Sequence, residues 1–166
     1  MFRITSLFLA ALAVPAFAAL GTQTSRQLQT NVVGIVDEIP TLSTFAEAIV
    51  KADGGLFDDG IAEDLYNPNA TLTVFAPTNN AFAALPDGLL TTLLTPGFNM
   101  HLTEILAYHV YDDAIVLSTD LAATQVVEMV SGGSVTVNVT DAGVTVTTTA
   151  GVTARVTGAD NEASNG

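Results

Sequence analysis

The stretch TLTVFAPTNNAFAAL, residues Thr71 to Leu85, changes its pattern halfway along. Residues 71–75 alternate polar and apolar side chains, which predicts a half-buried strand. Pro77 has no backbone N–H and ends strand pairing, and Thr78 is a residue type whose hydroxyl commonly caps the start of a helix. We therefore predict a strand that turns directly into a short helix whose Phe82 enters the core, and interpret this corner as architectural.

The chain has 166 residues, a length that suits one domain. Residues 1–18 have a basic start, an apolar middle and the small-x-small pattern Ala16-Phe17-Ala18, which together predict a secretory signal peptide. An uncleaved membrane anchor is the alternative. Residues 19–30 are polar and are predicted to form a flexible leader, and residues 31–166 to form a single domain.

The charge and the cysteine content exclude several classes of function. Without residues 1–18 the chain has 3 basic and 17 acidic side chains, a formal charge of −14. No basic surface for nucleic acid can be built, and docking on anionic lipid or membrane insertion of the mature chain is not expected. The chain has no cysteine, so a hydrophobic core must stabilise it without disulfides, and thiol chemistry is excluded.

The hydrophobic pattern predicts helices first and strands later. Helical spacing of apolar residues is found in 31–39, 41–52, 86–97 and 101–110, and the acid-rich segment 56–69 is interpreted as a solvated loop. Asp58-Asp59-Gly60 within it does not fit the ligand spacing of a calcium loop. Four runs rich in Val and Thr, separated by Gly-containing turns, follow from residue 124 and predict an antiparallel meander. The order indicates an α+β domain.

Four stretches resemble the fasciclin domain family, in the order that this family uses. They are TLTVFAPTNNAF from Thr71, EILAYHV (Glu104 to Val110), VVEMVSGGSVTVNV, and VTGADNEASNG (Val156 to Gly166). The resemblance implies a wedge of two β-sheets with several helices packed along one side. It also implies that the chain lacks the last strand of the domain, because the family pattern continues past Asn165-Gly166.

The resemblance further implies an extracellular adhesion module. In related animal proteins the Tyr-His region, here Tyr108 and His109, has been implicated in integrin binding. Asp160 lies in the second signature and is a third candidate for partner binding, although Asn161 follows it where adhesive members typically have isoleucine. The alternative interpretation of His109 is a buried histidine at a helix end that hydrogen-bonds backbone or polar groups near Asn79.

Catalytic and metal-binding patterns are sparse. The two histidines are His101 and His109, and His101 with Glu104 could supply two metal ligands on one helix face without a third from His or Cys. No Gly-x-Ser-x-Gly motif is present. We therefore predict no enzyme activity, no cofactor and no metal site.

Two sequons for N-glycosylation occur, at Asn69 and Asn138. Asn69 is the better candidate because it precedes a predicted strand, whereas Asn138 lies within one and must face solvent to be used. We predict a secreted, acidic, non-catalytic glycoprotein that binds an extracellular protein or matrix partner, or itself; it would be periplasmic if bacterial. The alternatives are an extracellular enzyme or small-ligand-binding protein on the same fold and an acidic protein associated with matrix or mineral.

Overall fold

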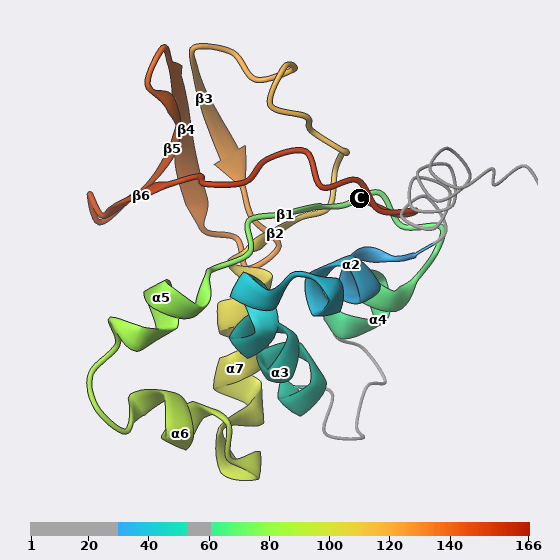
Figure 1. Cartoon of the computed structure of the whole chain (residues 1–166), viewed down its shortest axis with the longest axis vertical. Helices are drawn as coiled ribbons and strands as arrows, with labels where there is room; N and C mark the ends of the chain where they lie inside the picture. The colour runs from blue at the N-terminus through green and yellow to red at the C-terminus, as the bar shows by residue number, and fades with distance from the viewer. Residues whose placement is uncertain (1–29, 53–60) are drawn as a thin grey trace, which may run out of the picture.

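The computed structural model describes residues 30–52 and 61–166. The predicted signal peptide, nearly all of the predicted leader and the Asp58-Asp59-Gly60 segment lie outside the described residues. Figure 1 shows two parts stacked on each other: a group of helices, and a sheet whose strands rise from one end of that group. The architecture is the predicted mixed α+β one.

Six α-helices and two 3₁₀ turns lie in the described ranges 30–52 and 61–166. They are α2 (Val32–Glu38), η1 (Pro40–Leu42), α3 (Ser43–Ala52), α4 (Ile61–Tyr66), α5 (Asn79–Ala83), α6 (Leu89–Leu93), η2 (Pro96–Phe98) and α7 (Asn99–Ala107). Helix α4 contradicts the interpretation of residues 56–69 as one solvated loop. Its Ile61 and Leu65 are buried among the other helices, so two apolar residues at helical spacing outweighed the acidic composition.

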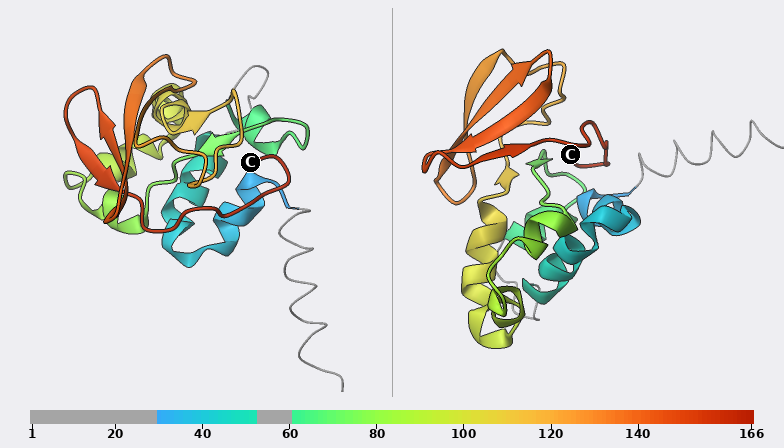
Figure 2. Two further views of the ribbon diagram at one scale, coloured as in Figure 1. Left: turned by 90° about the horizontal axis from the view of Figure 1, so that it is seen from above. Right: turned by 60° about the vertical axis from the view of Figure 1, so that its left-hand side comes forward.

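The strands form the predicted meander and a second, smaller pairing. β3 (Thr124–Glu128), β4 (Ser134–Thr140), β5 (Gly143–Thr148) and β6 (Thr153–Arg155) pair antiparallel in chain order. β1 (Thr73–Val74) pairs antiparallel with β2 (Val110–Tyr111). The sheet turns away from the helices, and the chain after β6 returns past β1 toward α2 (Figure 2).

The strand-to-helix corner is built differently from the prediction. β1 has two residues, and the predicted cap is wrong, because the Thr78 side chain makes no cap hydrogen bond to α5. The next residue, Asn79, instead reaches across to α3. Its side-chain oxygen accepts the Thr44 N–H at 3.0 Å, and its amide nitrogen donates to the Pro40 carbonyl at 3.0 Å. The corner is architectural because it caps a neighbouring helix.

Two hydrophobic clusters divide the molecule. The helical cluster includes Phe45, Ile49, Leu65, Leu72, Leu106 and Val110, all at most 1% exposed. Phe82 packs partly buried against this cluster, as expected. The sheet cluster is made by Val127, Met129, Val135 and Val137, with Phe75, Tyr108 and Tyr111 packed against it. Because strand side chains alternate, Val127, Val135 and Val137 face this cluster, while Val126 and its partner Thr136 lie on the opposite face of the sheet.

Asn165 joins the C-terminal segment to the helices. It is the buried polar residue among those the structure describes, and its side chain is 0% exposed. Its side-chain oxygen accepts the Val32 N–H at 2.8 Å. Its side-chain nitrogen donates to the backbone carbonyls of Leu65 at 3.1 Å and Asn67 at 2.9 Å. One amide therefore satisfies backbone groups at the start of α2 and at the end of α4.

Candidate functional site

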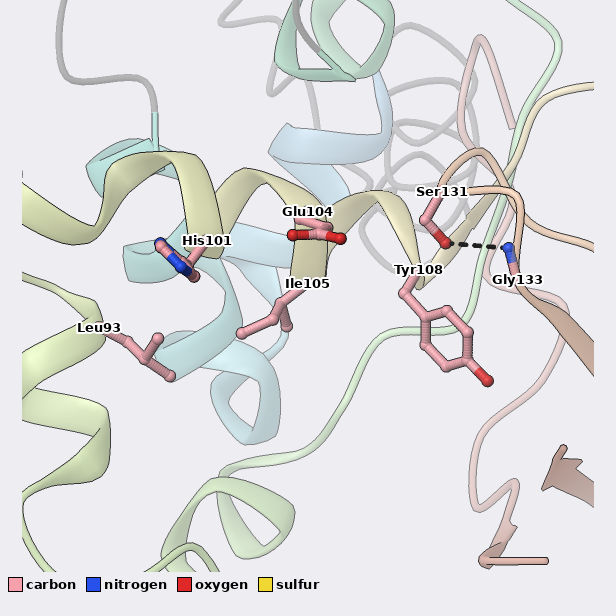
Figure 3. Close-up of a pocket in the computed structure, with 7 residues that line it drawn as sticks. All are labelled: Leu93, His101, Glu104, Ile105, Tyr108, Ser131 and Gly133. Carbon is pink, nitrogen blue, oxygen red and sulfur yellow. Dashed lines mark hydrogen bonds between the residues drawn. The ribbon is translucent and has the colours of Figure 1, made fainter. Parts of the chain in front are cut away.

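Helix α7 presents one face to solvent and the opposite face to the core. His101, Glu104, Ile105 and Tyr108 recur at intervals of three or four residues, which places them on one side of a helix. Leu102 and Leu106 occupy the other side and are 2% and 1% exposed. Figure 3 shows the outward set along the helix. Ile105 belongs to this outward set and is 39% exposed.

This outward face forms the floor of an open cavity of about 440 Å³, which we call the α7 groove. Leu93 of α6 borders one end of the groove, and Ser131 and Gly133 of the β3–β4 turn border the other (Figure 3). The turn is held there by backbone hydrogen bonds, from Val130 N–H to the Val110 carbonyl at 2.9 Å and from Ser131 N–H to the Ala107 carbonyl at 3.3 Å. The sheet and the helices thus share this groove.

Other apolar side chains are exposed on the elements that contribute to or adjoin the α7 groove. Leu89, Phe98 and Val130 are 40%, 40% and 37% exposed, and Met100 is 83% exposed. Large apolar side chains gathered on a surface are typical of sites that contact another molecule.

His109 lies next to Tyr108 in sequence but outside the α7 groove. Its Nδ1 is 2.7 Å from the Ile105 carbonyl oxygen, and because a carbonyl only accepts, Nδ1 carries the hydrogen. Its ring centroid is 6.3 Å from that of Phe45 and 6.2 Å from that of Tyr108. Burial lowers the pKa of His109, and the Ile105 hydrogen bond partly opposes this effect. The partner is therefore backbone, as expected, and it belongs to α7, the helix that ends just before His109.

The geometry keeps the two histidines apart. Their positions are eight residues apart, which corresponds to about 12 Å along a helix. His101 lines the α7 groove with Glu104, whereas His109 lies outside it and hydrogen-bonds to the Ile105 carbonyl. Within residues 30–52 and 61–166, no group of three or more His, Asp or Glu side chains could hold a metal ion.

Asp160 lies on the segment after β6 and away from the α7 groove. Its carboxylate accepts the Ser118 N–H at 2.7 Å and the Ser118 hydroxyl at 2.6 Å. These two hydrogen bonds lower the pKa of Asp160, with the hydroxyl contributing most. Its φ of 58° is in the left-handed region, which aspartate tolerates better than most residues. The structure therefore brings Tyr108 and His109 together and leaves Asp160 elsewhere.

The two sequon asparagines differ in their surroundings. Asn69 is exposed in the loop between α4 and β1. Asn138 lies on β4 with its side chain on the outward face of the sheet, where its oxygen accepts the Thr124 hydroxyl at 3.1 Å. Asn138 therefore meets the condition of facing outward, but it is half-buried between neighbouring strands.

Comparison with known proteins identifies the family. The sequence model described as Fasciclin domain matches residues 40–166. The chain belongs to the fasciclin domain family. Domains of this family are generally non-catalytic adhesion modules and are typically extracellular. Among the helices of the described residues, none is long and apolar enough to cross a membrane.

Relatives of this fasciclin domain occur in bacteria and animals. Protein sll1483 of Synechocystis sp. is 34% identical over 149 residues, covering 90% of this chain and 74% of the relative. The uncharacterized protein sll1735 of the same organism is 34% identical over 112 residues, covering 67% and 75%. The rabbit transforming growth factor-beta-induced protein ig-h3 is 50% identical over 50 residues, covering 30% of this chain and 7% of the rabbit protein.

Proposed function

We propose that this fasciclin domain is a secreted, non-catalytic adhesion or matrix-interaction module that contacts its partner through the α7 groove and the apolar side chains around it. The observation that carries the proposal is the apolar row along the groove, formed by the exposed Ile105 and the half-buried Tyr108 and Leu93. A surface of this kind suits a broad protein contact, in which aromatic and aliphatic anchors supply most of the binding energy.

The arrangement of polar groups argues for binding and against catalysis. A general acid or base must reach a reacting atom together with a second positioned group. In the α7 groove, Glu104 and His101 lie on an open helix face, and His109 is held on another side of the helix. Two groups on an open surface do not exclude water from a reaction, whereas they are well placed at the edge of a protein contact.

A small-ligand-binding protein is the second candidate, and the volume of the α7 groove favours it. About 440 Å³ is within the usual range of ligand pockets. The groove is open to solvent, however, whereas such pockets usually bury most of the surface of a ligand. We therefore place adhesion first.

An attachment assay tests the proposed function. The mature chain, with residues 1–18 removed, is coated on a surface, and the retention of cells or of isolated matrix from its source is measured. We expect retention above that of a coating of the urea-unfolded chain, because the groove exists only in the folded domain. Equal retention by the two coatings would contradict the proposal. Turnover of an ester or glycoside library by the folded chain would favour an enzyme instead.

A further inference from the structure

We propose that the α7 groove receives a short segment of a partner protein in which apolar anchor residues are flanked by lysine or arginine. This inference rests on the proposed function and specifies the partner class. Three features of the molecule support it: the lining of the groove, the distribution of charge over the domain, and the polar groups at the groove that have no partner within the domain.

The lining of the groove selects an apolar anchor. Of the seven residues that line it, Leu93, Ile105 and Tyr108 contribute the large apolar surface. Phe98 extends this surface beyond the groove, with its ring centroid 5.8 Å from that of His101. Burying exposed apolar side chains against an anchor yields about 25 cal/mol per Å², so a segment with leucine, isoleucine or phenylalanine gains most here.

The charge of the domain selects basic flanks. The described residues include two basic and fourteen acidic side chains, a formal charge of −12. The two basic residues are Lys51 on α3 and Arg155 on β6, and neither lines the groove. Glu104 is the carboxylate that does, and it is exposed. A basic segment is therefore attracted by the whole domain and finds a carboxylate beside its anchors.

The same charge argues against a second copy of this chain as the occupant. Two domains that each have a formal charge of −12 in their described residues repel one another. Lys51 and Arg155 are already included in this formal charge, so they do not remove the repulsion. A partner of opposite charge avoids the repulsion.

The Tyr108 hydroxyl gives the groove a polar contact for a peptide backbone. Among the described residues it has no hydrogen-bond partner, and it points away from the helix (Figure 3). The ring itself is fixed between α7 and the β3–β4 turn, because it lies directly against Gly133. A fixed phenol with a free hydroxyl suits recognition, since it combines apolar area with one directed hydrogen bond at a low entropic cost.

The test uses three synthetic peptides as probes and the mature chain. The first has two leucines four residues apart flanked by lysines, the second replaces the lysines with glutamate, and the third replaces the leucines with serine. Calorimetry measures each dissociation constant. We expect the first peptide to bind at least about tenfold more tightly than either of the others, with an affinity that falls on raising the salt from about 0.05 M to about 0.5 M.

Matched variants locate the site. Glu104→Lys and Ile105→Ser should each weaken binding of the first peptide by about tenfold or more. Glu63→Lys on α4 makes the same charge change on an exposed residue outside the groove, and Val126→Ser replaces an apolar residue that is 67% exposed on β3. Neither control should change the dissociation constant more than about twofold.

Three results would overturn the proposal. Equal weakening by Glu104→Lys and Glu63→Lys would show that only net charge attracts the peptide. Equal binding of the first and second peptides would show that basic flanking residues do not contribute to binding. A mature chain that dimerises without peptide, and becomes monomeric with Ile105→Ser, would make a second copy the occupant. Peptide binding at the groove without attachment in the coating assay would uphold this proposal and contradict the adhesive function.

Discussion

The ring of Tyr108 lies so close to Gly133 that no side chain fits between them. A Cβ on Gly133 would lie 2.5 Å from Cε2 and 2.9 Å from Cδ2 of Tyr108. This contact joins the end of α7 to the turn between β3 and β4, and it fixes the aromatic side of the α7 groove. The proposed binding surface thus depends on a glycine in a different part of the fold.

Gly133→Ala should disturb this wall while leaving the rest of the domain folded. The methyl group forces the Tyr108 ring or the turn to move, at a cost of about 1–3 kcal/mol for overpacking. Urea unfolding measures the cost, and partner binding should weaken with it. Gly132→Ala is not a neutral control, because Gly132 has a φ of 78°. Gly97→Ala is the suitable control, because a Cβ added there would meet no neighbouring side chain or segment within 4 Å. Equal destabilisation by Gly133→Ala and Gly97→Ala would contradict the importance of the Tyr108–Gly133 contact.

Asn165→Ala should destabilise the domain strongly. The substitution leaves the Val32 N–H and the Leu65 and Asn67 carbonyls without their partner inside the protein. Leaving such groups unsatisfied costs about 3 kcal/mol in total, which urea unfolding would show as a lower midpoint. Asn161→Ala removes an exposed asparagine of the same segment and should cost less than about 0.5 kcal/mol. Similar midpoints for the two variants would refute the role of Asn165.

His109 should make the stability of the domain depend on pH. Because burial lowers its pKa from 6.5, the unfolded chain takes up a proton that the folded chain resists. The stabilisation is therefore complete above pH 6.5 and is lost as the pH falls through that value toward the lowered pKa. His109→Ala should flatten this part of the profile of unfolding free energy against pH.

The same variant should cost about 1–3 kcal/mol at neutral pH, because the Ile105 carbonyl loses a hydrogen bond. His101→Ala is the matched control, since His101 is exposed on the same helix. It should leave the urea midpoint unchanged. A profile that stays steep between pH 7 and about pH 5 in His109→Ala would assign the titration to another group.

The Ser118–Asp160 contact should respond to acid. The hydrogen bonds from Ser118 hold the pKa of Asp160 below 3.8, so the contact persists above that pH and is lost as the pH falls through the lowered pKa. NMR titration of the Asp160 carboxyl carbon measures this pKa directly. In Ser118→Ala the hydroxyl bond is absent and the pKa should rise toward 3.8. An unchanged pKa in that variant would show that the hydroxyl does not stabilise the carboxylate.

Asn69 should be the glycosylated sequon if the chain is secreted by a eukaryotic cell. It is exposed in a loop, whereas Asn138 is half-buried on β4 and bonded to Thr124. Mass spectrometry before and after glycan removal measures occupancy. Asn69→Gln should abolish the mass shift and Asn138→Gln should preserve it. The opposite pattern would contradict the assignment.

The sequence predicted the elements whose patterns are local. The Val and Thr runs after residue 124 formed the meander because alternation and glycine-containing turns act within a few residues. Helix α4 was not predicted, because acidic residues dominate its sequence. Its two buried side chains, Ile61 and Leu65, pack against helices that are distant in the sequence. Residue patterns do not show which other elements lie nearby, so the prediction failed where tertiary packing decided the outcome.

The candidate site was predictable only in part. Tyr108 was found through the family resemblance, and it does line the α7 groove. Ser131 and Gly133 were missed because they join the groove through packing between the sheet and α7. Helical spacing alone could have grouped Glu104, Ile105 and Tyr108 on one face. It could not show whether Ile105 or the pair Leu102 and Leu106 enters the core, because all three are apolar. The buried Asn165 had no local pattern to mark it.

The most direct test of the adhesive surface compares two single substitutions in the coating assay. Ile105→Ser removes an apolar side chain from the α7 groove, and Val126→Ser removes a more exposed one from the outward face of β3. Both variants are first shown to unfold at the wild-type urea midpoint. The account predicts that Ile105→Ser loses most of the retention and that Val126→Ser keeps it. Full retention by Ile105→Ser, or equal loss in both variants, would contradict it.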